Sequence, residues 1–137
     1  MLKHSTIRLI AAIFISPITP GILFLFVSIF GNISEGVWAL KLCAMLGYPV
    51  IIVIGIPAHL FFVSVNLRNL LIYNIFGVFV STLISFIIFY KNIINMFSFG
   101  DGGMSVIFIF LVSIFIGVLV STVFWLIVRP DRELPVS

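Results

Sequence analysis

Four long apolar stretches, separated by short polar segments, make up most of the chain. They lie at about 9–30, 42–65, 70–90 and 104–128, and none contains an Asp, Glu, Lys or Arg. Each is long enough to cross the roughly 30 Å of hydrocarbon in a bilayer as a helix. Their apolar residues are continuous and do not alternate with polar ones, which argues against membrane-barrel strands. The pattern predicts an all-α polytopic membrane protein, a bundle of four transmembrane helices forming a single domain over residues 1–137.

The composition supports the membrane assignment. Apolar residues make up 63% of the 137 residues and charged residues only 8%, against roughly 45–50% and about 25% in soluble domains. Too little polar material is present to cover a water-facing surface. Disordered, coiled-coil and disulfide-rich classes need high charge or many cysteines, and the chain has one cysteine, Cys43. We interpret Cys43 as a small packing residue.

The basic residues predict the orientation of the spans. Lys3 and Arg8 precede a first apolar run that is longer than a signal-peptide core and lacks a clear cleavage site, so we interpret it as a membrane anchor. Five basic residues fall on one side of the four spans, and Lys41 and Lys91 on the other. By the positive-inside rule, both termini face the cytoplasm of a bacterial inner membrane. The five are Lys3, Arg8, Arg68, Arg129 and Arg132.

The polar segments between the spans are short. The segment 66–69 is brief enough to predict that the second and third spans are antiparallel neighbours. We expect outer loops at about 31–41 and 91–103, the second with a turn at Asp101, Gly102 and Gly103, and a short solvated tail from Arg129. The lipid bilayer is therefore the expected environment of nearly the whole chain.

Small residues recur every four positions in the last two spans, at Gly77, Ser81 and Ser85 and at Ser113, Gly117 and Ser121. This spacing allows close backbone approach between helices in lipid. We predict an intramolecular hairpin with Gly77 opposite Ser121 and Ser81 opposite Gly117. The alternatives are that one row packs on another helix or across a homodimer.

Prolines interrupt the first two spans. Pro17 and Pro20 lie in the first, and Pro49 and Pro57 in the second, where Gly47 and Gly55 accompany them. Each proline lacks a backbone donor, so we expect a kink or a local opening. Such breaks form binding sites in transporters. The simpler interpretation is a kink whose freed carbonyls bond to Ser16 and Thr19.

A few polar residues remain inside the spans, towards the predicted cytoplasmic half. His59 and Asn74 lie on spans joined by the short 66–69 segment, so they can approach each other. An ionisable residue inside a membrane is a candidate functional group, and a structural histidine bonded to Asn74 or to a carbonyl is the alternative. We hypothesise a cytoplasm-facing crevice, a binding site lined by Ser16, Thr19, His59, Tyr73 and Asn74.

The sequence contains no recognisable catalytic machinery. All four carboxylates fall in predicted loops or the tail, so no intramembrane pair is available for acid–base chemistry, for a metal ion or for proton-coupled export. We find no phosphate-binding glycine loop and no zinc motif, and we expect no cofactor. The basic residues are scattered, which argues against nucleic-acid binding.

Two motifs carry a resemblance to a known group of proteins. They are the Gly55–Leu60 segment (GIPAHL) and the Phe124–Asp131 segment (FWLIVRPD). There the chain resembles small uncharacterised four-span inner-membrane proteins of Gram-negative bacteria. The resemblance covers about a tenth of the chain. It implies a four-helix inner-membrane protein and no particular activity.

Three functional hypotheses remain, none of them enzymatic. The missing catalytic groups and the small-residue rows favour an interaction or accessory protein of a membrane complex, associated with a membrane-protein partner or with its own copies. The interrupted helices favour a transporter or channel component acting as an oligomer. Size and topology also fit an immunity protein against a pore-forming bacteriocin.

Overall fold

The computed structural model describes residues 2–98 and 103–129, and every element in these ranges is helical. Four segments are long and apolar enough to cross a membrane: Thr6–Ser28, Ile33–Ser64, Leu70–Lys91 and Val106–Val128. The predicted all-α class and the four apolar helices are confirmed. The elements are α1 (Leu2–Ile15), α2 (Thr19–Ser28), α3 (Ile33–Val50), the π-helix η1 (Ile51–Gly55), α4 (Ile56–Ser64), α5 (Leu70–Ser98) and α6 (Gly103–Val128).

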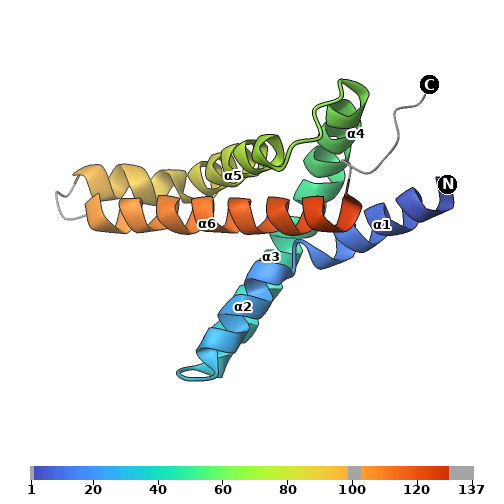
Figure 1. Cartoon of the computed structure of the whole chain (residues 1–137). Coiled ribbons are helices and arrows are strands. Elements are labelled where there is room, and N and C mark those ends of the chain that lie inside the picture. The colour runs from blue at the N-terminus through green and yellow to red at the C-terminus, as the bar shows by residue number, and fades with distance from the viewer. Residues whose placement is uncertain (1, 99–102, 130–137) are drawn as a thin grey trace.

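The helices form two hairpins that diverge. Figure 1 shows α5 and α6 side by side and antiparallel, while α2 and α3 form a second hairpin that leaves the first at a steep angle. The first span bends sharply between α1 and α2, and α1 packs on α6. The second span continues from α3 through η1 into α4. The bundle is therefore open on one side.

Helices occupy much of the two predicted outer loops. The structure starts α3 at Ile33, where Asn32 caps the helix: its Oδ1 accepts a hydrogen bond from Ser34 N at 3.2 Å, and its Nδ2 donates to Glu35 at 3.2 Å. At the other loop, α5 continues to Ser98. The predicted loops at 31–41 and 91–103 are thus wrong over these stretches, because polar residues outside the hydrocarbon can remain helical. Asp101, Gly102 and the tail from residue 130 lie outside the described residues.

The turn between α4 and α5 is well defined by its hydrogen bonds. Asn66 adopts a φ of 59°, a left-handed conformation that Asn tolerates better than most residues. Its N–H donates to Val63 O at 3.2 Å and that of Leu67 to Phe62 O at 2.8 Å, which is the Schellman pattern. Asn69 then caps α5 by accepting from Leu71 N.

The prediction that the spans flanking this turn are packed antiparallel neighbours is wrong. After the turn α5 diverges from α4 and packs along α6. The two helices meet near the turn through side chains, with the Phe62 ring 5.2 Å from the Tyr73 ring and 5.4 Å from the Phe76 ring. The indole Nε1 of Trp125 in α6 donates to Arg68 O at 3.0 Å, which holds the turn against α6.

The α5–α6 hairpin is held by close backbone contact. A Cβ added at Gly77 would lie 2.7 Å from Gly117 O and 2.7 Å from Ser121 Cβ. Ser81 Oγ donates to Ser113 O at 2.8 Å, and Ser113 Oγ donates to Ser85 Oγ at 2.6 Å. The structure thus places Gly77 against Ser121 and Ser81 against Gly117, in one hairpin. We refer to Gly77, Ser81, Ser85, Ser113, Gly117 and Ser121 together as the small-residue face.

The α2–α3 hairpin uses the same principle. A Cβ at Gly21 would lie 2.8 Å from Leu40 Cα, and one at Gly36 would lie 2.9 Å from Leu25 Cα. A Cβ at Gly47 would lie 2.6 Å from Pro17 Cβ. Glycine at positions 21 and 36 brings α2 and α3 into direct contact, and glycine at position 47 brings α3 against the break before α2.

We predict that Gly117→Ala destabilises the protein. The added methyl group would press on Gly77 O and on Ser81, and overpacking of this kind costs about 1–3 kcal/mol. Reversible unfolding in mixed detergent micelles, followed by tryptophan fluorescence, measures the loss of free energy of unfolding. Gly31→Ala is the matched control, because a Cβ at Gly31 meets nothing within 4 Å. Equal stability of the two variants would contradict the close contact.

Candidate functional site

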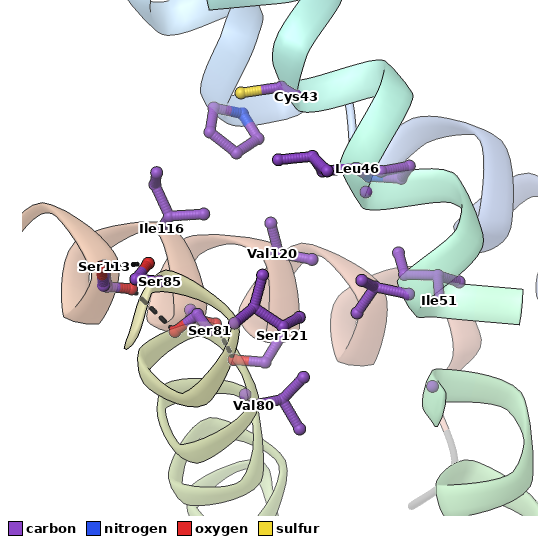
Figure 2. A pocket seen from close by; sticks show the side chains of 18 of the residues that line it. Cys43, Leu46, Ile51, Val80, Ser81, Ser85, Ser113, Ile116, Val120 and Ser121 are labelled. Carbon is purple, nitrogen blue, oxygen red and sulfur yellow. Dashed lines mark hydrogen bonds between the residues drawn. The ribbon is translucent and has the colours of Figure 1, made fainter. Parts of the chain in front are cut away.

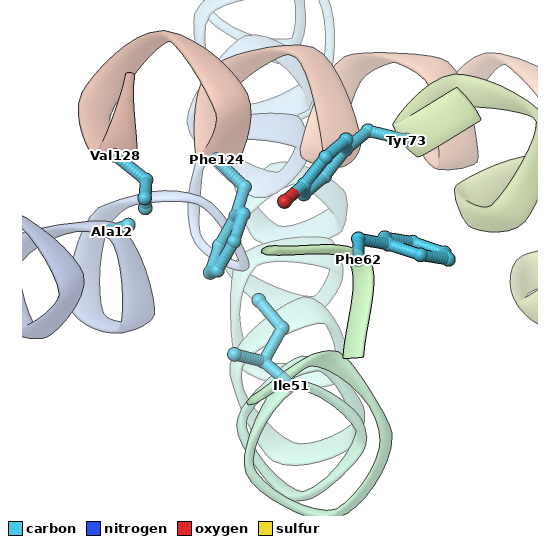
Figure 3. Packing of buried hydrophobic residues seen from close by; sticks show 6 residues of the cluster. All are labelled: Ala12, Ile51, Phe62, Tyr73, Phe124 and Val128. Atoms are coloured by element: carbon cyan, nitrogen blue, oxygen red, sulfur yellow. The ribbon is translucent and has the colours of Figure 1, made fainter. Parts of the chain in front are cut away.

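The first and last spans, η1, α4 and the start of α5 meet at one apolar junction. Figure 3 shows its six buried side chains converging from these elements. Neighbouring rings pack edge to face: Phe62 lies against Tyr73, and His59 lies 5.6 Å from Phe124, a favourable geometry for aromatic pairs. This junction joins α1, η1 and α4 to the α5–α6 hairpin. Its six residues are Ala12, Ile51, Phe62, Tyr73, Phe124 and Val128.

His59 and Tyr73 form a hydrogen-bonded pair in the junction. The His59 Nδ1 and Tyr73 Oη atoms are 2.8 Å apart, and each residue is only 5% exposed. An imidazole nitrogen and a phenol oxygen can form this bond with either as the donor, depending on the tautomer. Because neither group has to be charged, the pair can be buried in hydrocarbon at low cost. The bond links α4 to α5 near the turn that connects them.

An apolar groove with a volume of about 510 Å³ runs from the junction between the two hairpins. Figure 2 shows Cys43, Leu46 and Ile51 on one side of it, and Ile116 and Val120 of α6 on the other. The junction residues Ile51, Phe62, Tyr73 and Phe124 also line the groove and form one end of it.

Only two of the five residues of the hypothesised crevice come together. His59 and Tyr73 bond to each other and line the groove, whereas Ser16, Thr19 and Asn74 are not among its lining residues. Ser16 is fully buried and donates to Ala12 O at 2.6 Å, and Thr19 donates to Ile15 O at 2.9 Å.

Asn74 lies on a different side of α5 from Tyr73. Its Oδ1 accepts hydrogen bonds from Ser121 at 2.7 Å and from Thr122 at 3.0 Å. Successive residues of a helix point about 100° apart, so Tyr73 faces α4 while its neighbour faces α6. The expected approach of His59 to Asn74 therefore does not occur, and Tyr73 takes that place.

The small-residue face contributes to the groove as well as to the hairpin. All six of its members line the groove. In Figure 2 the labelled serines of this face lie beside Ile116 and Val80 at the groove wall, with the Ser81–Ser113 and Ser113–Ser85 hydrogen bonds between them. These hydroxyl groups bond within the α5–α6 hairpin, and Ser113 and Ser121 are buried there.

The two helix breaks lie next to each other at the edge of the groove. Pro17, in the break between α1 and α2, contacts Gly47 of α3 and lines the groove. Tyr48 Oη donates to Phe14 O at 3.1 Å, a carbonyl that the break leaves without its usual helical partner. In the second span the break takes the form of η1, in which Ile56 N donates to Ile51 O. Pro57 follows directly and has no N–H to donate.

Sequence reasoning missed Gly47 and Tyr48 as contacts between the first two spans. Gly36, Leu40, Cys43 and Gly47 recur at intervals of four, three and four residues, the spacing of one helix face. That pattern could have identified the face of α3 that packs on α2. No spacing of residues in the sequence indicates the hydrogen bond between Tyr48 and Phe14.

The groove offers mainly apolar contact, because the serine hydroxyls along it bond within the α5–α6 hairpin. Within residues 2–98 and 103–129 no three His, Cys, Asp or Glu side chains gather in a group that could hold a metal ion. The one carboxylate in that part of the chain, Glu35, accepts from Asn32 at the start of α3. The arrangement is suited to non-covalent binding of an uncharged, apolar surface.

Comparisons of the chain with protein-family models, with curated proteins and with solved structures find no match. The geometry of the groove and of the junction is therefore the basis for a functional proposal.

We predict a measurable coupling between His59 and Tyr73. In a double-mutant cycle with His59→Phe and Tyr73→Phe, we expect a coupling energy of about 0.5–1.7 kcal/mol, the range for hydrogen bonds in membrane proteins. Unfolding in mixed micelles provides the free energies. Tyr90→Phe, at an exposed position towards the other end of α5, is the control and should leave stability unchanged. If the effects of the two substitutions on the free energy of unfolding are additive, the bond does not contribute to stability.

Proposed function

We propose that the protein is a non-catalytic interaction or accessory protein of the bacterial inner membrane. In this proposal its groove receives one transmembrane helix of a partner protein. The observation that carries the proposal is that the small-residue face both joins α5 to α6 and lines the groove.

The surface of this wall favours a helix over lipid as the occupant. Between helices in lipid, burial of apolar side chains supplies little driving force, and association depends on close backbone approach and hydrogen bonds. The partly buried Gly77, Ser81 and Ser85 provide small side chains and hydroxyl oxygens on the α5 side of this wall. An acyl chain gains nothing from hydroxyl groups. A helix with its own small residues could approach this wall closely and share its hydroxyls.

The lining also restricts the chemistry of the partner. Apart from the His59–Tyr73 pair, Cys43 and the serine hydroxyls, the lining side chains are apolar, with Trp38 among them. A charged side chain would find no opposite charge there, which is costly inside a membrane. The proposed partner helix is therefore uncharged over the segment that enters the groove.

The basic residues support an orientation with both termini in the cytoplasm. Arg8, Arg68 and Arg129 belong to α1, the α4–α5 turn and the end of α6, which lie towards one end of the molecule in Figure 1. The α2–α3 turn and the far ends of α5 and α6 point away from it. The positive-inside rule assigns the arginine-bearing end to the cytoplasm.

We predict opposite labelling of two single-cysteine variants, each in a Cys43→Ser background. Gly31→Cys, at the α2–α3 turn, should react with a membrane-impermeant maleimide in intact spheroplasts of a Gram-negative host. Leu67→Cys, at the α4–α5 turn, should react only after the membrane is opened. Both positions are exposed. The reverse result would invert the proposed orientation.

A second candidate function is a transporter or channel component acting as an oligomer. The adjacent helix breaks beside the groove favour it, because transporters place substrate sites where interrupted helices meet. This function requires several copies of the chain around a shared aqueous path. The mass of cross-linked products separates it from the first proposal.

We predict site-specific photo-cross-linking from the groove to one partner. A photoreactive phenylalanine at Ile116, in the groove wall, should yield a discrete adduct in the native membrane. The adduct should contain a peptide from an uncharged transmembrane segment of a second protein, and the reciprocal probe in that segment should return to the groove. The same residue at Ile87, which is 66% exposed and not a lining residue, is the matched control and should give lipid adducts only.

Two outcomes would count against the partner-helix proposal. An adduct at twice the mass of the chain would mean that a second copy fills the groove, and would favour the oligomeric transporter. Lipid adducts alone at Ile116, as at Ile87, would mean that the groove holds acyl chains in the membrane.

A further inference from the structure

We infer that the α2–α3 hairpin is a hinged arm that pivots at the two adjacent helix breaks and so widens or narrows the groove. We call this hairpin, residues 19–50, the arm. The inference goes beyond the proposed function and does not depend on which molecule enters the groove.

Both connections of the arm to the rest of the chain are interrupted at the same level. Residues 16–18 form a turn between α1 and α2, and η1 separates α3 from α4. The contact between Pro17 and Gly47 and the Tyr48–Phe14 hydrogen bond place the first break beside the last turn of α3, directly before η1. Two breaks that lie side by side allow both helices of the arm to bend about one axis. Breaks at different depths would give the two helices different axes and so resist bending of the arm as a unit.

The arm packs mainly on itself. Gly21 meets Leu40, and Gly36 meets Leu25 and Ser28, so its two helices touch along their length. Beyond the breaks, the arm packs on the rest of the molecule mainly through a smaller contact of α2 with α6, and α3 makes no contact of comparable extent with α5 or α6. The groove occupies the space between them. The arm can therefore move as a rigid unit.

The base of the hinge is fixed to the α5–α6 hairpin. Helix α1 packs on α6, where Ala12 and Val128 lie against each other in the junction. Helix α4 is held to α5 by the His59–Tyr73 bond and by Phe62. Both helices thus remain in place on the far side of each break.

Movement at these breaks disturbs few hydrogen bonds. Pro17 and Pro20 have no N–H, so the carbonyls four residues before them lack helical partners in any arm position. In η1 the wider turn is already present, with Ile56 bonded to Ile51. Hinges of this kind act where a few residues at the ends of elements absorb the change in backbone angles.

Distances between paired spin labels in lipid nanodiscs test this inference. The arm pair is Gly31→Cys with Lys91→Cys in a Cys43→Ser background, which joins the tip of the arm to α5. Both positions are exposed, and a Cβ at Gly31 meets nothing. The control pair, Leu71→Cys with Lys91→Cys, lies within α5 at about 30 Å. We expect a wider distance distribution for the arm pair, and an equally narrow one would overturn the hinge.

A hinge variant gives a second, independent readout. Pro57→Ala restores an N–H directly after η1, which allows the π-helix to convert to regular α-helix. We expect the mean distance of the arm pair to shift and its distribution to narrow. Val53→Ala, in η1 with a 70% exposed side chain, is the matched control and should leave the distribution unchanged. An unchanged arm distance in Pro57→Ala would overturn the assignment of η1 as part of the axis.

Discussion

The architecture depends on one constraint: inside a membrane, burying apolar side chains does little to bring helices together. Association then requires direct backbone contact or hydrogen bonds. The contact between Gly77 and Gly117 meets this requirement for α5 and α6, and Gly21 and Gly36 meet it for α2 and α3. Each hairpin is consequently a tight pair. Between the hairpins, comparable small-residue contacts are lacking in the described part of the chain. There α2 meets α6 in a smaller contact, and the junction holds α1 and α4 to α5 and α6.

The junction explains why the groove exists. Large rings at Phe62 and Tyr73 keep the backbone of α4 away from α5, and Phe124 of α6 packs against His59 of α4. A junction of glycines would allow α4 to approach α5 and α6 closely. Because the rings hold α4 away, a groove remains beside the α5–α6 hairpin, and the partly buried Gly77, Ser81 and Ser85 line it.

The sequence predicts the helices well and their mutual arrangement poorly. Uncharged runs identify the four spans, because a charge in hydrocarbon is costly, and the four-residue spacing of Gly77, Ser81 and Ser85 gives the register of the last hairpin. In contrast, the sides of α6 facing lipid and facing protein are equally apolar, as the exposed Ile107 and Phe108 illustrate. Hydropathy therefore gives no indication of which helices are neighbours. It could not show that α4 diverges from α5, or that Tyr73 and not Asn74 meets His59.

The second span is longer than the last one. The second span, Ile33–Ser64, has 32 residues, against 23 in Val106–Val128, which correspond to about 48 Å and about 34 Å of helix. Part of this difference is the segment 33–41, which carries Glu35 and Lys41 and can lie outside the hydrocarbon as helix. Helix α2 stays packed against α3, whereas α1 packs on α6, because the break at 16–18 lets the two halves of the first span take different directions. The groove is the space that this divergence leaves beside α5 and α6.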